Sequence, residues 1–138
     1  MKKIILIPVL FFFISSFSQE IIGKWKTVDA NNKAQSIVEI YKNNNLFYGK
    51  IIKVFNDEGK TICDYCKGQF KDKDMIGLII LKDLKKEKDI YEDGKITDPE
   101  IDKTYSCYVK LENPNKLKLR GFIGFSLIGR TEYWYRVK

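Results

Sequence analysis

Histidine is absent from this chain of 138 residues, and its absence excludes several kinds of site. A serine or cysteine hydrolase triad uses an imidazole as its general base, and many zinc sites use histidine as a ligand. The side chain that most readily changes its charge between about pH 5 and pH 8 is also missing. We therefore expect no catalytic residues, no cofactor and no metal ion, and we expect that the protein is not an enzyme.

Long apolar runs and isolated basic patches are also lacking beyond the N-terminal residues. No later segment reaches the run of about 18–20 apolar residues that a membrane-spanning helix needs, so no transmembrane segment is expected. The formal net charge is +7, but acidic and basic residues are interleaved, as in residues 83–89. Interleaved charge is typical of a solvated loop, so we expect 83–89 to be a loop and expect no nucleic-acid partner.

A short apolar run is present at the start of the chain. Residues 4–14 are apolar and follow two lysines, and this run is too short to span a bilayer. Ser16 and Ser18 then place small residues before Gln19, in the pattern of a cleavage site. The pattern predicts a signal peptide over residues 1–18 and export to the periplasm or the medium. Gln19, not a cysteine, is the first residue after the expected cut, so no lipid anchor is expected.

Residues 19–138 are enough for one domain with a hydrophobic core. Within them, short runs of alternating apolar and polar residues recur between turn residues such as Asn113-Pro114-Asn115. Period-two alternation is typical of half-buried antiparallel strands. The pattern predicts strands at 23–29, 37–42, 46–55, 75–83, 89–91, 94–97, 105–111, 116–123 and 131–137. The count is eight if 89–91 and 94–97 form one bulged strand.

Strands joined in chain order by short turns form a meander, and about eight of them can remove their free edges by closing into a barrel. We therefore predict an all-β fold, a single antiparallel up-and-down β-barrel. In such a barrel the first and last strands are neighbours, so an arginine of one can cover a tryptophan of the other. The residues expected to close the barrel are Trp25 on the first strand and Arg130, Trp134 and Arg136 on the last.

The start Gly23-Lys24-Trp25 resembles that of the calycin barrels, which comprise the lipocalins and their relatives. A wider set of segments extends from Ile22 to Val137: residues 23–27, 36–38, 40–41, 48–51, 63–68, 94–96, 98–100, 103–105, 107, 120–124, 129–131 and 134. In order and spacing they resemble domain-of-unknown-function family 2147, a family of exported bacterial proteins. The resemblance implies a lipocalin-like barrel and export, and it implies no functional residues because the family has no assigned activity.

Cys63, Cys66 and Cys107 are the cysteines of the chain, and outside the cytoplasm they allow at most one internal disulfide and leave one thiol. We favour a structural disulfide; a bridge to Cys107 would close a longer loop than Cys63–Cys66 and stabilise more. Three alternatives stay open. They are a thioredoxin-type pair, a zinc site completed by Asp64 or water, and unpaired buried cysteines, an interpretation that suits Cys107.

An eight-stranded barrel can hold one small ligand, and we expect binding of a small apolar or amphipathic ligand. The residues expected to face that ligand are Trp25, Val38, Ile40, Tyr105, Val109 and Leu119. The alternative is a filled barrel that acts as a structural or interaction module of the cell envelope. The third hypothesis, a thiol enzyme, would use Cys63 and Cys66.

Two further segments have competing interpretations. Residues 122–128 are strongly apolar, and they either enter the core or form a hairpin at the barrel mouth that contacts lipid or a partner. The carboxylates of residues 98–102 suit a glycosidase or a calcium site in principle. Because Asp98 precedes Pro99, we expect a solvated turn there instead.

Overall fold

The computed structural model describes residues 2–5, 7–12 and 20–138. The expected cleavage site at Ser18 and Gln19 lies outside the described residues. The elements are β1 (Gly23–Val28), β2 (Ala34–Asn43), β3 (Leu46–Val54), β4 (Ile62–Cys63), the 3-10 helix η1 (Gly68–Phe70), β5 (Lys73–Asp74), β6 (Ile79–Glu87), β7 (Ile90–Asp98), β8 (Lys103–Asn113), β9 (Lys116–Phe122) and β10 (Gly129–Val137).

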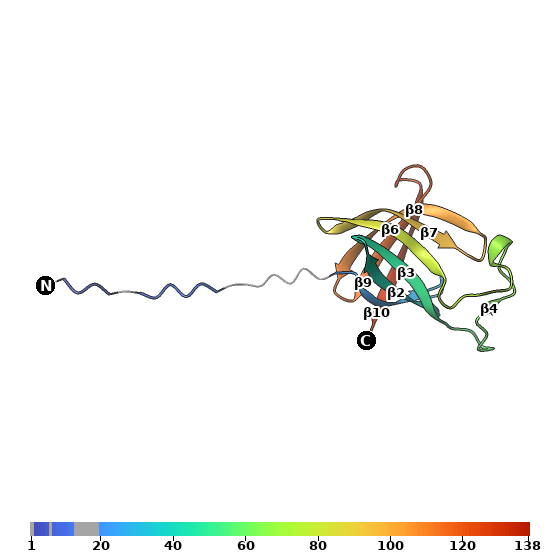
Figure 1. Cartoon of the computed structure of the whole chain (residues 1–138), viewed down its shortest axis with the longest axis horizontal. Coiled ribbons are helices and arrows are strands. Elements are labelled where there is room, and N and C mark those ends of the chain that lie inside the picture. Colours follow the sequence, from blue (N-terminus) through green and yellow to red (C-terminus); the bar gives the residue numbers. More distant parts are fainter. Residues whose placement is uncertain (1, 6, 13–19) are drawn as a thin grey trace.

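Eight of these strands close into one antiparallel barrel in the order β1-β10-β9-β8-β7-β6-β3-β2 (Figure 1). Strands β4 and β5 form a separate two-stranded sheet. The predicted all-β, eight-stranded antiparallel barrel is therefore confirmed. The segments 89–91 and 94–97 become one strand, β7, which begins at Ile90, and its register with β8 shifts between Tyr91 and Gly94.

The prediction of a solvated loop at 83–89 is wrong, because most of this segment lies in β6 and Leu84 is fully buried. Asp83 adopts a left-handed backbone with φ of 60°, which interrupts the alternation of inward and outward side chains. Leu81 and Leu84 are both buried although they are three positions apart. A strict period-two pattern therefore misses this strand, and it also places its start too early, at residue 75 instead of Ile79.

One half of the barrel interior is packed with large apolar side chains. Phe47 and Tyr91 contact each other edge to face, with ring centroids 4.9 Å apart. The side chains that fill this half and are no more than 2% exposed include Trp25, Val38, Ile40, Phe47, Leu84, Tyr91, Cys107, Val109 and Leu117. Burial of these groups supplies the main driving force for folding. We call this region the closed half of the barrel.

The seam between β1 and β10 is covered by one arginine. Trp25 and Arg136 are register partners across the seam, and the Arg136 Cζ atom lies 4.3 Å from the Trp25 ring centroid. The Arg136 guanidinium also donates hydrogen bonds to the carbonyl oxygens of Pro114, Ile22 and Glu20. Because β1 pairs only with residues 135–137 of β10, the other two residues expected at the seam, Arg130 and Trp134, do not take part in it.

The long connection between β3 and β6, residues 55–78, contains β4, η1 and β5, and we call it the strap. In Figure 1 it lies on the side of the barrel away from the N-terminus. The Lys67 N–H donates to the Glu100 carbonyl oxygen at 3.1 Å, and the Gln69 side-chain amide donates to Asp102 at 3.1 Å. These bonds attach the strap to the turn between β7 and β8.

Candidate functional site

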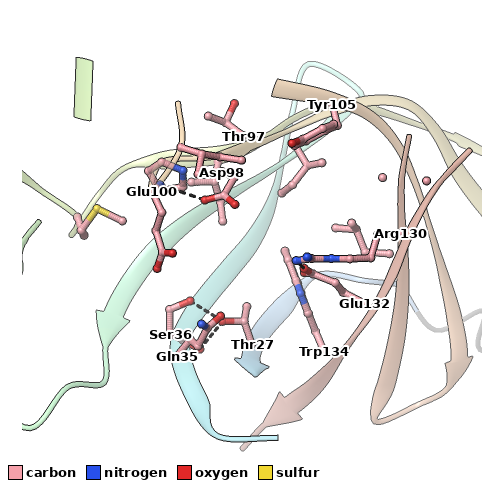
Figure 2. A pocket seen from close by; sticks show the side chains of 18 of the residues that line it. Thr27, Gln35, Ser36, Thr97, Asp98, Glu100, Tyr105, Arg130, Glu132 and Trp134 are labelled. Atoms are coloured by element: carbon pink, nitrogen blue, oxygen red, sulfur yellow. Dashed lines mark hydrogen bonds and ion pairs between the residues drawn. The ribbon is translucent and has the colours of Figure 1, made fainter. Parts of the chain in front are cut away.

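The half of the barrel next to the strap contains a cavity of about 690 Å³, a volume within the usual range for small-molecule sites. Its apolar wall comes from the strap and from strands on opposite sides of the barrel: Val54, Met75, Ile80, Ile96, Leu119, Phe122 and Trp134. Its polar groups are Thr27, Gln35, Ser36, Tyr65, Thr97, Asp98, Glu100, Tyr105, Arg130 and Glu132, most of which are labelled in Figure 2. We call this region the open half of the barrel.

Two of the six residues expected to face a ligand, Tyr105 and Leu119, line this cavity. The other four, Trp25, Val38, Ile40 and Val109, belong to the closed half and are at most 1% exposed. The alternating pattern identifies which side chains point inward. It does not show which inward side chains pack against one another and which surround a cavity.

The polar wall contributed by β10 was not anticipated as a ligand site. Arg130, Glu132 and Trp134 follow one another at alternate positions and all line the cavity. The signal is visible in the sequence, because alternate residues of one strand share a face. Arg130 and Trp134 are expected from the sequence to close the barrel, so the alternation on β10 does not identify them as ligand-site residues.

Two of the charged groups at the mouth form an ion pair. The Arg130 guanidinium donates to the Glu132 carboxylate at 2.8 Å. This hydrogen bond and then the charge of Glu132 raise the pKa of Arg130, and the charges of Asp98 and Tyr105 act in the same direction. The Arg130 guanidinium is therefore paired with a carboxylate of its own strand.

The turn between β7 and β8 brings two more carboxylates to the cavity. Asp98 accepts a hydrogen bond from the Glu100 backbone N–H at 3.0 Å, as an aspartate does when it opens a turn. Partial burial, followed by the charge of Asp98, raises the pKa of Glu100. On the strap, burial and then the charges of Glu100 and Asp64 raise the pKa of Tyr65. Asp98 and Glu100 therefore place two carboxyl groups at the edge of the cavity.

Trp134 supplies an unpaired hydrogen-bond donor on the cavity wall. The side chain is 2% exposed, and its indole N–H has no hydrogen-bond partner. Leaving such a buried donor unpaired costs about 1–3 kcal/mol. Across the barrel, the hydroxyls of Thr27 and Ser36 bond to each other at 2.7 Å, so they do not satisfy Trp134. The indole nitrogen is itself covered by protein atoms, so an acceptor on a bound molecule would reach it only after the ring or a neighbouring group moved.

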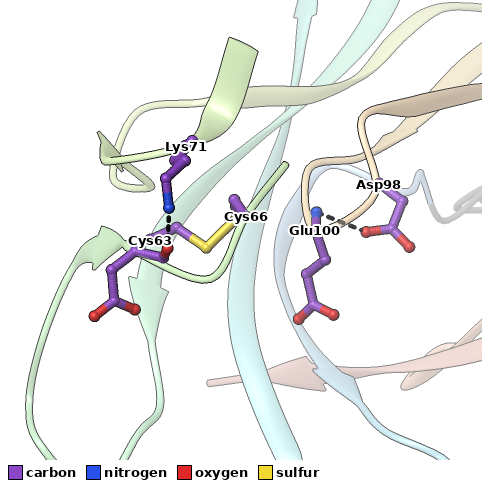
Figure 3. The surroundings of a disulfide bond; sticks show 6 residues. Cys63, Cys66, Lys71, Asp98 and Glu100 are labelled. Carbon is purple, nitrogen blue, oxygen red and sulfur yellow. Dashed lines mark hydrogen bonds between the residues drawn. A yellow bond between two sulfur atoms is a disulfide. The ribbon is translucent and has the colours of Figure 1, made fainter. Parts of the chain in front are cut away.

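The three cysteines form one disulfide and leave one free thiol. Cys63 and Cys66 are bonded to each other within the strap, beside the turn that carries Asp98 and Glu100 (Figure 3). Cys107 is a free cysteine buried in the barrel. The longer bridge to Cys107 is thus not formed, and a zinc site built on Cys63 and Cys66 is incompatible with their bond.

A thioredoxin-type interpretation also lacks its local structure. Such a pair is activated at the start of an α-helix. After Cys66 the chain forms only the three-residue 3-10 helix η1, Gly68–Phe70. Across the described ranges no group of three or more Cys, Asp or Glu side chains is arranged to hold a metal ion.

We expect Cys107 to resist iodoacetamide in the folded protein, because its side chain is buried and burial raises the pKa of the thiol to about 12. Thiolate, not thiol, is the nucleophile. In denaturant, intact-mass measurement should show one alkylated cysteine before reduction and all three after it. Alkylation of Cys63 or Cys66 without reductant would contradict the disulfide.

In the apolar segment 122–128, Phe122 is the last residue of β9, and residues 123–128 form an exposed loop between β9 and β10, not a part of the core. Its exposed side chains are Ile123 at 69%, Phe125 at 61%, Leu127 at 86% and Ile128 at 62%. Arg120 holds the loop by donating to the backbone oxygens of Ser126 and Leu127. Ile123 and Ile128 also line the cavity, so the loop stands at the mouth of the open half.

None of the residues that the structure describes belongs to a helix with the length and apolarity needed to cross a membrane. Among curated proteins, none matches this sequence. The solved structure of HP1028 from the human pathogen Helicobacter pylori, which "belongs to the lipocalin family", is similar with a TM-score of 0.72 and 24% sequence identity. The similarity covers 86% of this chain and 84% of that one, and at this identity it shows the fold alone.

The family model of DUF2147, an uncharacterised protein conserved in bacteria, matches residues 23–136. The match spans the whole barrel, from the first residue of β1 to the penultimate residue of β10. The resemblance found in the sequence is thereby confirmed, and the chain belongs to the DUF2147 family.

Proposed function

We propose that this protein binds one small apolar or amphipathic molecule in the open half of the barrel. The cavity of about 690 Å³ carries the proposal. A barrel with only a structural role would gain stability by filling this space, because native interiors pack closely. The ring of Trp134 forms part of the wall and offers an apolar surface to such a molecule.

We further propose that the protein is exported and that it is a binding protein, not an enzyme. The apolar start of the chain has the composition of a signal peptide. The disulfide in the strap is of a kind that persists outside the cytoplasm. The cavity lining offers carboxylates, hydroxyls and one guanidinium, but it contains no nucleophile paired with a base.

Binding can be tested with dodecanol, a neutral probe with one hydroxyl. The chain has two tryptophans, and their indole N–H signals can be followed in the ¹⁵N-labelled protein. We expect saturable 1:1 binding in which the Trp134 signal shifts. The Trp25 signal should stay in place, because its indole N–H is already bonded to the Ile21 carbonyl oxygen in the closed half, at 2.8 Å. An unchanged Trp134 signal at saturating dodecanol would reject this function.

A second candidate is a contact module of the cell envelope that works through the exposed loop 122–128. The observation that favours it is the set of four large apolar side chains on this loop, each more than 60% exposed. Single exposed apolar residues are common, whereas a cluster marks a contact surface. Replacing Phe125 and Leu127 by serine should then release the protein from envelope fractions. Unchanged fractionation would reject this role.

A further inference from the structure

The cavity has a charge opposite to that of the chain. The formal net charge of the chain is +7, yet the charged residues that line the cavity are three carboxylates, Asp98, Glu100 and Glu132, and one guanidinium, Arg130. No lysine is among the lining residues that the structure describes. The lining thus has a formal excess of two negative charges.

Two of these carboxylates, Asp98 and Glu100, form no close ion pair among the residues that the structure describes. Arg130 is paired with Glu132 at 2.8 Å. The Asp98 carboxylate accepts a hydrogen bond from the backbone N–H of Glu100, and its charge also acts on the more distant Arg130 guanidinium. Figure 2 shows this pair on one side of the cavity and the Arg130–Glu132 pair on the other.

The space between these two sides is suited to an apolar chain. Ile96, Leu119 and the ring of Trp134 line it. The cavity volume of about 690 Å³ is an observation independent of the carboxylates, and it also points to a bound molecule. An apolar body in the barrel would leave a polar head at the mouth, next to Asp98 and Glu100.

We propose that the open half selects amphiphiles with a positively charged amine head, whose ammonium group lies against Asp98 and Glu100 while the chain lies on Ile96, Leu119 and Trp134. The proposal rests on the function proposed above and names its ligand class. An ammonium group is attracted by the two unpaired carboxylates, whereas a carboxylate head is repelled by them. Fatty acids are therefore disfavoured, although they match the apolar wall equally well.

The test uses three probes with the same twelve-carbon chain: dodecylamine, dodecanol and dodecanoate. Affinities are measured at neutral pH and low salt, below the concentrations at which the probes form micelles. We expect the amine to bind more tightly than dodecanoate by at least about tenfold, with dodecanol between them. The difference should shrink in about 0.5 M salt, because exposed charges are screened.

The matched variant replaces Asp98 by Asn and Glu100 by Gln. Asparagine keeps the oxygen that accepts the Glu100 N–H, so the turn is retained, and we expect the preference for the amine to disappear. As the control, Asp89→Asn with Glu112→Gln removes the same charge outside the cavity lining and should leave the preference intact. Folding of each variant is checked by its melting temperature.

The outcomes separate the two proposals. If dodecanol fails to bind, the proposed function itself is wrong. If dodecanol binds but dodecylamine is no tighter than dodecanoate, the cavity remains a ligand site and the amine assignment is overturned. If the amine preference is equally large in the Asp98 and Glu100 variant, the carboxylates do not cause it and the assignment is also overturned.

Discussion

Replacing Gly121 by phenylalanine is expected to lower the affinity for dodecanol by about 100-fold or more, equivalent to about 2.7 kcal/mol, while the barrel stays folded. Gly121 lines the cavity on β9. A Cβ atom added there would lie 3.6 Å from Ile96 Cγ2 and 3.9 Å from the Tyr105 Cβ, which are ordinary contact distances. The ring would therefore enter the open half and occupy the space that the ligand needs.

The matched control is a glycine in the closed half. A Cβ on Gly94 would lie 2.5 Å from Leu84 Cδ2 and 3.2 Å from the Cys107 sulfur. Even Gly94→Ala should therefore destabilise the protein, by about 1–3 kcal/mol. Urea unfolding and dodecanol titration of both variants test the pair. Unchanged dodecanol affinity in Gly121→Phe would place the binding site elsewhere, and unchanged stability in Gly94→Ala would contradict the tight packing of the closed half.

Replacing Trp25 by alanine is expected to lower the free energy of unfolding by about 3–5 kcal/mol, the largest stability effect that we expect from a single substitution. The Trp25 side chain is fully buried, and its N–H donates to the Ile21 carbonyl oxygen. The Arg136 guanidinium stacks on the ring from β10. Alanine would leave a cavity in the closed half and remove the surface on which Arg136 lies.

The control for this substitution is Tyr133, an aromatic residue on the last strand, β10. Tyr133 is 38% exposed, and Lys116 lies over its ring at 4.4 Å. Since exposed contacts of this kind are worth about 0.5–1 kcal/mol, Tyr133→Ala should have a much smaller effect than Trp25→Ala in urea unfolding. Equal losses in the two variants would show that the seam between β1 and β10 has no special role in stability.

The inward and outward faces of most strands could be predicted from the sequence, because alternation is a local property of the chain. The alternation assigns Tyr105, Val109 and Leu119 to the interior; Val109 and Leu119 are buried, and Tyr105 is half-buried and lines the cavity. The alternation failed where the backbone leaves its regular geometry. At Asp83 the positive φ changes the side on which the following residues lie, so Leu84 was missed.

The boundary between the closed and the open half could not be predicted from local pattern. It depends on the sizes of side chains that meet from strands distant in the sequence. The open half is surrounded by small or polar inward residues such as Thr27, Ser36 and Gly121, whereas Phe47 and Tyr91 meet in the closed half. Likewise, the disulfide could not be chosen among three cysteines, because the choice depends on how the strap folds back on itself.

Native mass spectrometry of the protein purified from the bacterium that produces it would test most directly whether the open half of the barrel holds a ligand. We expect a bound small molecule in 1:1 ratio that dodecanol displaces, and we expect the Gly121→Phe variant from the same cells to carry none. A wild-type protein that is always free of bound mass and forms no 1:1 complex with added dodecanol would contradict ligand binding in the barrel.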